Sequence, residues 1–469
     1  MSPTPSRISA LEFLAPMIVG CALFMEMLDA TVISTALPAM AKSLGEDPIK
    51  LNLAITSYLL SLAVFLPASG WLADRFGARR VFCSAIALFS LGSALCGLAQ
   101  SMPQLVLFRV LQGMGGAMMV PVGRLILLRS VPPARMVAAM VWFTVPGAIG
   151  RLAGPLLGGL VVTITSWRWI FLLNIPFGVL GVLMAMSFID DTHEPIYQRF
   201  DLAGFILLST GLVGLVGGLD TAGRGLVPQE VTFALAGFGL LSILAYWRYS
   251  RRHDDAIIDP GLLRYKAYRT AVVGGMPLRI AIGASPFLMP LMLQLGFGLS
   301  PLQSGSLSVA TAVGSLSVRA VMQQAIRRIG FRTLLIGATS LTGCFYAGYG
   351  LFQPTTPHLL IFVVLLFGGL FNSLGMVTLN TLGYSDMPKP MMSRATALSS
   401  MAQQLSISIG VAFAASLLAL TAHLHGGSAA HLTARDFSPA FAVVGVLTFC
   451  SLFFFTRLAH DEGAELRAR

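Results

Sequence analysis

Long apolar stretches recur along the whole chain, and they limit its possible folds more than any other feature. Each can cross the ~30 Å hydrocarbon core of a bilayer, because a helix rises about 1.5 Å per residue. Charged residues make up only 11% of the sequence, against roughly 25% in soluble proteins. We therefore predict an all-α membrane protein of about 14 spans, at residues 13–37, 50–72, 80–100, 102–125, 137–163, 168–188, 202–220, 229–249, 270–294, 302–325, 331–352, 357–381, 395–421 and 437–457.

The basic residues predict how these spans are oriented. If the N-terminus is cytoplasmic, 23 of the 31 lysine and arginine residues fall in cytoplasmic segments, 5 in external segments and 3 inside spans. Cytoplasmic loops of membrane proteins carry such an excess, so we expect an even number of spans and two cytoplasmic termini. The net charge of +11 then reflects membrane topology. No basic run is dense enough for a nucleic-acid partner.

A short motif repeats between the two halves of the chain. Residues 75–79, Arg-Phe-Gly-Ala-Arg, recur 253 positions later at 328–332 as Arg-Ile-Gly-Phe-Arg, and the same offset relates the Gly-Gly pairs at 115–116 and 368–369. Parallel repeats of this kind build two homologous halves in transporters. The predicted organisation is two six-helix bundles separated by two additional helices and a cytoplasmic linker, at residues 1–190, 267–469 and 191–266.

Five segments, in chain order, carry recognisable motifs: Leu28–Pro38, Gly70–Arg80, Arg109–Gly116, Trp167–Pro176 and Phe200–Gly204. They resemble the motifs of the major facilitator superfamily and of its fourteen-span drug:proton antiporter family. The resemblance covers most of the first half and, through the repeat, much of the second. It implies the major facilitator fold and alternating access between the two bundles.

The loop between the second and third spans resembles the signature loop of the superfamily. This implies a latch that holds one conformation and releases it during alternating access. Its aspartate can pair with an arginine, one glycine permits a tight turn, and the other lets helices approach closely. A plain positive-inside loop would explain only its arginines. The predicted latch residues, with their counterparts in the second half, are Gly70, Asp74, Arg75, Gly77, Arg79, Arg328, Gly330 and Arg332.

The fifth span resembles the antiporter motif, whose glycines permit close packing against span 8 of a twelve-helix relative. Arg151 departs from that pattern, because it places a charge where a small or apolar residue normally stands. The departure puts in doubt either the packing or the usual substrate chemistry. The predicted motif residues are Gly150, Gly154, Pro155, Gly158 and Gly159.

Five formal charges lie well inside the spans: Glu26, Asp29, Arg109, Arg151 and Arg279. A charge at the bilayer centre costs about 2.5–3.5 kcal/mol on insertion scales, so each needs a partner or a water-filled cavity. Asp29 lies near the midplane, and Glu26 is three residues away on the same helix face. Two such carboxylates cannot easily both ionise.

We therefore predict Asp29 and Glu26 as proton-coupling residues. The resemblance implies the same role for Arg109, because the arginine of the fourth span is linked to proton coupling in relatives. The alternative for Asp29 is a purely structural pair with Arg109, and for Arg109 a structural counter-ion. Arg151 and Arg279 could together hold an anion through charge-assisted hydrogen bonds. The other predicted substrate-binding residues are Gln112, Met25, Trp142, Phe143 and Asn372, although apolar members of such a set more often pack or face lipid.

The predicted function is proton-coupled export of lipophilic, often cationic, drugs. Three intramembrane arginines against two acids favour, as an alternative, export of a small organic anion such as a carboxylate metabolite. A non-transporting sensor is disfavoured because no loop is long enough for a soluble domain. We find no nucleophile–base pair, phosphate loop or metal-ligand cluster, so we expect no enzyme, metal or cofactor, and a proton gradient as energy source. We also expect a functional monomer in a bacterial inner membrane.

Overall fold

The computed structural model describes residues 5–132, 135–190, 199–222, 228–253, 256–388, 391–425 and 432–458, and these are helical with no strand. The parts of the predicted domains at 1–4, 191–198 and 459–469 lie outside the described residues. The first group of helices is α1 (Pro5–Leu44), η1 (Lys50–Asn52), α2 (Leu53–Phe65), α3 (Ala68–Phe76), α4 (Ala78–Leu98), α5 (Met102–Ser130), α6 (Met136–Ile164), α7 (Arg168–Leu172) and α8 (Asn174–Phe188).

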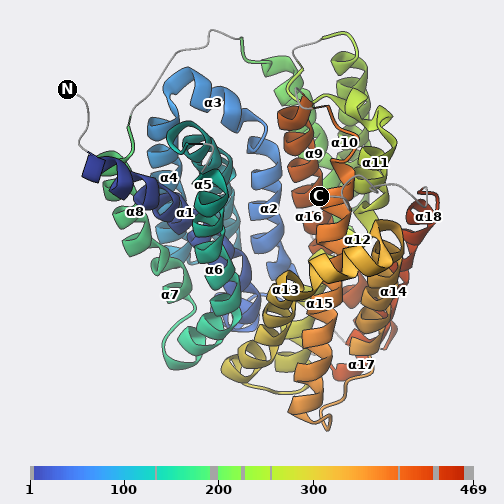
Figure 1. Ribbon diagram of the computed structural model, residues 1–469. Coiled ribbons are helices and arrows are strands. Elements are labelled where there is room, and N and C mark those ends of the chain that lie inside the picture. The colour runs from blue at the N-terminus through green and yellow to red at the C-terminus, as the bar shows by residue number, and fades with distance from the viewer. Residues whose placement is uncertain are drawn as a thin grey trace.

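The remaining helices form a hairpin, a linker and a second group, in that order along the chain (Figure 1). The hairpin consists of α9 (Leu202–Thr221) and α10 (Gln229–Ser250). The linker and the second group comprise η3 (Pro260–Arg264), α11 (Lys266–Arg269), η4 (Thr270–Gly274), α12 (Met276–Leu291), η5 (Met292–Gly296), α13 (Pro301–Ile329), α14 (Phe331–Tyr349), α15 (His358–Gly383), α16 (Met392–Leu424), α17 (Ala434–Cys450) and α18 (Leu452–Phe455).

Every predicted span falls on one of these helices or on a consecutive set of them. Within the described residues, 12 helical segments are long and apolar enough to cross a membrane, or 13 if α2 and α3, bent by 57°, form one span. Residues 331–352, predicted as a further span, correspond to α14 and fall outside this set. That helix is interrupted by threonines, serine and glycines, which lower its mean hydropathy. A multi-pass helical membrane protein is thus confirmed.

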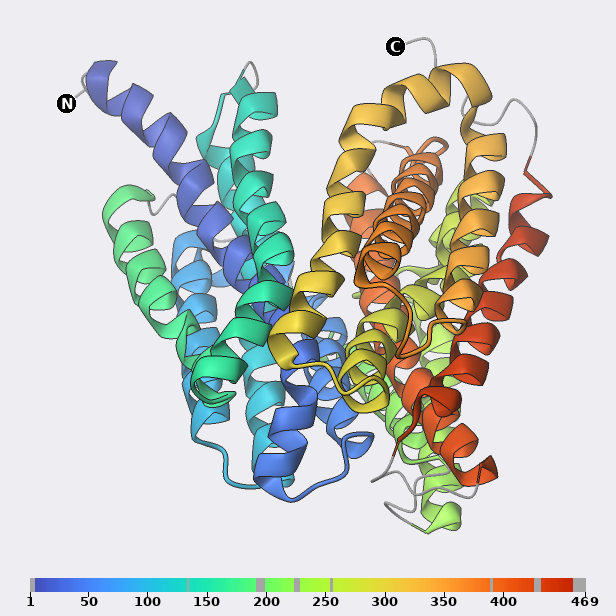
Figure 2. The same cartoon turned by 90° about the horizontal axis from the view of Figure 1, so that it is seen from below.

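The helices pack as two groups with the hairpin beside them. In the first group α1 packs on α6, and α5 packs on α2 and α4; in the second α12 packs on α16, and α14 on α15 and α17. The helices α9 and α10 pack on each other, and α9 also touches α2 and α16. Figure 2 shows the two groups side by side, with α13 of the second group against the first.

The two groups contact each other chiefly through two helix pairs, α6 with α13 and α2 with α16. The Gln294 side chain donates a 3.0 Å hydrogen bond to the carbonyl of Thr35, and Ser408 donates one of 3.4 Å to the carbonyl of Thr56. The backbones of Gly159 and Pro301 also meet. Ala63 and Val64 of α2 also share a buried apolar cluster with Leu398 of α16, so the contacts between the bundles are not confined to the α6–α13 interface.

Local sequence explains several helix boundaries. Ser300 and Gln303 form a capping box with Pro301 in the first turn of α13. Asp201 caps α9 by accepting a 2.8 Å hydrogen bond from the backbone N–H of Gly204. Gly77 separates α3 from α4 with a positive φ of 91°. These local signals determine where α13, α9 and α4 begin and where α3 ends.

Candidate functional site

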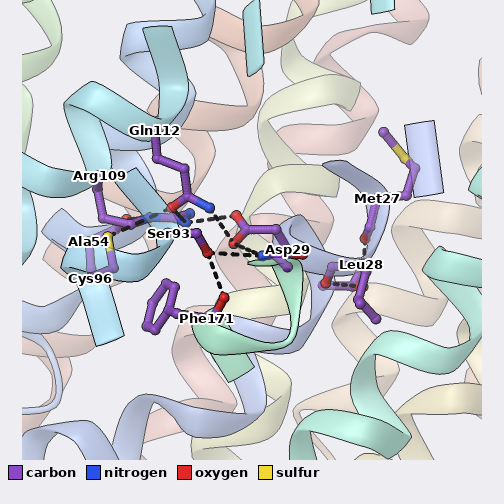
Figure 3. Close-up of polar contacts among 11 residues, drawn as sticks. Met27, Leu28, Asp29, Ala54, Ser93, Cys96, Arg109, Gln112 and Phe171 are labelled. Atoms are coloured by element: carbon purple, nitrogen blue, oxygen red, sulfur yellow. Dashed lines mark hydrogen bonds and ion pairs between the residues drawn. The ribbon is translucent and has the colours of Figure 1, made fainter. Parts of the chain in front are cut away.

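The centre of the first bundle contains a buried ion pair. Nη1 of Arg109, on α5, lies 2.7 Å from Oδ2 of Asp29, on α1. The exposed fractions of the two side chains are 0% and 1%. Figure 3 shows the carboxylate and the guanidinium pointing toward each other between the helices. The structure therefore contains the pairing that the sequence left open as a structural alternative.

Neutral polar groups complete the shell around this ion pair. Gln112 donates to Oδ1 of Asp29 at 2.9 Å and accepts from Nη1 of Arg109 at 2.7 Å. Asn174 lies 3.5 Å from the same aspartate oxygen and donates to Oγ of Ser93 at 3.1 Å. The serine donates in turn to the carbonyl of Phe171 at 2.8 Å (Figure 3). The network links α1, α4, α5, α7 and α8.

Arg109 has further contacts on its other side. Its Nε donates a 2.9 Å hydrogen bond to the carbonyl of Ala54, and its Cζ lies 4.2 Å from the ring centroid of Tyr58. Its Nη2 is buried without a hydrogen-bond partner among the described residues. A buried cation held by one carboxylate, a carbonyl and an aromatic face loses much of its stabilisation when the carboxylate is neutralised.

The sequence analysis did not single out several members of this shell, namely Ser93, Asn174 and Tyr58. Each was a polar side chain inside an apolar span, and Asn174 stood within a recognised motif. Buried polar groups must find partners, which was the available signal. A single helix periodicity could not indicate that side chains from α2, α4 and α8 converge on one ion pair.

Glu26 and Arg151 lie beside this network rather than in it. Glu26 is buried, and its Oε2 has no hydrogen-bond partner among the described residues. Arg151 is exposed, and its Nη2 lies 3.2 Å from the sulfur of Met27. A carboxylate and a guanidinium thus approach the same stretch of α1 without forming an ion pair in the described part of the chain.

Arg279 is buried in the second bundle at 1% exposure. It donates to the carbonyls of Ala271 and Val272 at 2.9 and 3.4 Å and to Oδ1 of Asn380 at 3.1 Å. Those carbonyls belong to the π-helical turn η4. No ion pair among the described residues includes this arginine, and the hydrogen bonds of Arg279 and Arg151 share no partner there. The two predicted anion ligands therefore have separate partners in this conformation.

The other predicted substrate residues are dispersed. Met25 and Phe143 are buried in the core of the first bundle, whereas Trp142 is 41% exposed. Asn372, on α15, has a buried Oδ1 with no hydrogen-bond partner among the described residues. Gln112 belongs to the ion-pair network. Whether these side chains bind a substrate stays a prediction.

Comparison with known proteins places this architecture in a family. The sequence profile of the Major Facilitator Superfamily matches residues 19–411. The chain belongs to the major facilitator superfamily. A protein of Pectobacterium atrosepticum named "Putative multidrug resistance protein MdtD" is 40% identical over 445 residues, which are 95% of each chain. Its namesake in Yersinia pestis is 40% identical over 451 residues, covering 95% of this chain and 96% of the relative.

Solved structures of other transporters share the fold. An auto-inhibited peptide transporter of the POT family matches 96% of this chain and 98% of its own with a TM-score of 0.67 at 14% identity. A D-xylose–proton symporter matches 96% and 99% with a TM-score of 0.66 at 15% identity. The family predicted from the motifs is confirmed, and the chain is a major facilitator transporter.

The superfamily's signature loop adopts related geometry in both halves. Asp74 accepts a 2.8 Å ion-pair hydrogen bond from Nη2 of Arg129, on α5. Arg79 donates to the carbonyl of Ile189, at the end of α8, and Arg332 donates to that of Thr456, after α18. Arg75 and Arg328, each four residues before one of these two arginines in the sequence, are exposed.

One predicted role in this loop was wrong. Gly70 does not provide a close helix approach, because a Cβ placed on it would have no heavy atom within 4 Å. It is exposed on α3. Its small size is therefore not required by packing in this conformation.

The helix with the antiporter-motif glycines packs on α13, the counterpart of the predicted partner helix, and also on α1, which was not predicted. A Cβ on Gly150 would lie 2.6 Å from the carbonyl oxygen of Phe24, and one on Gly158 would lie 2.7 Å from that of Val32. Gly154 also faces α1. Gly159 and Pro155 contact α13: a Cβ on Gly159 would lie against the carbonyl of Pro301, and one on Gly305 against that of Pro155. Four glycines on one helix, spaced by four or fewer residues, allow backbones to approach on two sides.

Proposed function

We propose that this transporter exports lipophilic, often cationic, compounds in exchange for protons. Two sets of observations support the proposal: relatives at 40% identity are named as multidrug resistance proteins, and the membrane interior holds two buried carboxylates, Asp29 and Glu26. The observation that carries it is the buried ion pair of Asp29 and Arg109, because a proton can compete with the arginine for the carboxylate.

Proton exchange at Asp29 would change the network around it. When Asp29 is ionised, it binds Arg109 and Gln112 and ties α1 to α5. When it is protonated, Arg109 loses its anion and keeps the carbonyl of Ala54, Gln112 and the ring of Tyr58. The weakened tie lets the helices rearrange, and the two bundles rock against each other. Glu26 then serves as the second acid, facing the cationic cargo.

The test uses purified protein in liposomes that contain a pH-sensitive dye. A proton gradient is imposed, and lipophilic cations are added to wild-type protein and to Asp29→Asn. We expect cation-triggered proton movement in the wild type and its loss in the variant, because asparagine cannot carry the proton. Thermal unfolding of both proteins checks that the variant is folded. Full coupled transport by Asp29→Asn would contradict the proposal.

A second candidate function is export of a small organic anion. It is favoured by Arg279, a buried cation whose partners in the described part of the chain are neutral. An Asn380→Asp variant places a carboxylate 3.1 Å from this guanidinium and should satisfy it internally. If di- or tricarboxylates trigger proton movement in the wild type and Asn380→Asp abolishes that movement, the anion assignment replaces the cation assignment.

The proposal includes a topology. Fourteen spans would result if α2 with α3 crosses as one bent span and α14 crosses as another, in two bundles at 1–190 and 267–469 with the hairpin between them. Both termini would be cytoplasmic, in the inner membrane of a bacterium, and the protein would work as a monomer. Labelling of single cysteines at residues 2 and 469 by a membrane-impermeant reagent in intact cells tests this: labelling of either would contradict it.

A further inference from the structure

The cytoplasmic end of α10, as the proposed topology orients it, carries a basic hollow that the transport mechanism does not use. The hollow has a volume of about 320 Å³ and is open and shallow. Its lining residues are Leu244, Trp247, Arg248, Arg251 and Arg252. We propose that it binds the phosphate headgroup of an anionic phospholipid. This goes beyond the proposed function and does not depend on which substrate is transported.

The helix that carries the hollow faces the membrane. In the apolar 18-residue stretch of α10, only 22% is buried inside the protein, the lowest share among the 12 candidate spans of the described residues. Leu241 and Leu244 are exposed on the same stripe as Arg248 and Arg251, since the spacing of three, four and three residues follows the helical repeat. An acyl chain lying along the leucines would therefore bring its headgroup to the arginines.

The arginines stand at the depth of lipid headgroups. Tyr249, near the end of α10, donates a 2.7 Å hydrogen bond to Asp201, which caps the start of α9. Both hairpin ends thus meet at this level. Trp71 and Phe200, which directly precedes Asp201, are in ring contact with centroids 4.9 Å apart, and Trp247, two residues before Tyr249, is exposed. Aromatic residues of this kind concentrate at membrane–water interfaces.

The three guanidinium groups are available for a ligand. Arg251 lies over the ring of Trp247, with its Cζ 4.9 Å from the centroid. None of the three arginine side chains forms an ion pair or a hydrogen bond with another described residue. The end of a helix carries about half a negative charge, which is smaller than three positive charges. Asp254 and Asp255 follow in the sequence but lie outside the described residues, and counting both still leaves a positive balance.

This combination favours a lipid over other occupants. A phosphodiester with two acyl chains complements both the arginines and the exposed apolar stripe, and basic pockets at this side of membrane proteins bind anionic headgroups. A free phosphate would leave the leucines uncovered. A protein partner or a second copy of the chain would need an acidic patch next to an apolar one.

The test titrates the purified full-length protein with phosphatidylglycerol in detergent and counts bound lipids by native mass spectrometry. Phosphatidylcholine with the same acyl chains is the neutral probe. The variant is Arg248→Gln/Arg251→Gln. Its matched control is Arg264→Gln/Arg269→Gln, which removes the same charge from exposed arginines outside the hollow. We expect the variant to bind phosphatidylglycerol roughly thirtyfold more weakly, since each arginine near an anionic headgroup contributes about fivefold.

The control should bind as the wild type does, and phosphatidylcholine should bind weakly to all three proteins. Equal affinity of variant and wild type, or an equal loss in the control, would overturn the site. Displacement of the lipid by millimolar inorganic phosphate or by soluble glycerophosphoglycerol would assign a free anion instead. A dimer mass that excludes the lipid would assign the face to a second copy. Should the double variant fail to fold, the single variants Arg248→Gln and Arg251→Gln give the same test with roughly fivefold losses.

Discussion

Gly77 and Gly330, which are 253 residues apart in the sequence, share a backbone conformation that other residues rarely adopt. Their φ angles are 91° and 85°, and their ψ angles 133° and 161°. Each separates two consecutive helices, α3 from α4 and α13 from α14. The short sequence motif that repeats at residues 75–79 and 328–332 thus has the same backbone geometry in both places, which supports two homologous halves.

This geometry predicts that alanine at either glycine destabilises the protein. A Cβ in this region is strained, at a cost of about 1–3 kcal/mol, so Gly77→Ala and Gly330→Ala should each lower the midpoint of thermal unfolding. Gly70→Ala is the matched control, because Gly70 belongs to the same loop motif but is helical with open space around it. An unchanged midpoint in both test variants would contradict the expectation.

Much of the fold followed from the sequence because its causes are local. Apolar runs longer than a bilayer must be helices, and each predicted span falls on helical residues. Mean hydropathy alone could not decide whether α14 spans the membrane. Its threonines and glycines lower the mean hydropathy in the same way whether the helix packs inside a bundle or lies outside the membrane. The bend between α2 and α3 was also not predicted, although Pro67 stands at the break between Phe65 and Ala68.

The candidate site was predictable in its members but not in its contacts. Asp29 and Arg109 stood out because charges inside spans are rare, and they do form an ion pair. The same argument treated Arg279 as an anion ligand and could not foresee that a π-helical turn would supply it with carbonyls. Such partners depend on how helices distant in sequence pack, and no single-sequence pattern encodes them.

The ion pair should be a strong determinant of stability as well as of transport. Arg109→Gln leaves the Asp29 carboxylate buried at 1% exposure without its cation, and breaking a buried pair in this way costs roughly 3–5 kcal/mol. Adding Asp29→Asn removes the uncompensated charge, so the double variant should be more stable than Arg109→Gln alone. Thermal unfolding of the three variants measures this. Additive losses would mean that the two side chains do not interact in the purified protein.

Close packing between α1 and α6 should be sensitive to a single methyl group. Alanine at Gly158 would place Cβ 2.7 Å from the carbonyl oxygen of Val32, so Gly158→Ala should destabilise the protein by about 1–3 kcal/mol, as overpacking does. Gly337→Ala is the control, since Gly337 is also helical and has nothing within 4 Å of a Cβ. There the better helix propensity of alanine should be neutral or slightly stabilising. Similar unfolding midpoints for the two variants would argue against the packing.

Arg151 should limit how well the transporter binds cations. The guanidinium is exposed and lies 3.2 Å from the sulfur of Met27, next in sequence to the buried Glu26, so it repels a cationic cargo that approaches this acid. Removing a like charge at this range changes binding by about 1 kcal/mol. We expect Arg151→Gln to lower the KM for a lipophilic cation about fivefold, with little change in kcat, whereas Glu26→Gln should raise it. Initial rates of cation-triggered proton movement in liposomes provide both constants. A higher KM for the cation in Arg151→Gln would contradict the repulsion, whereas a higher KM for a dicarboxylate would assign this arginine to an anionic cargo.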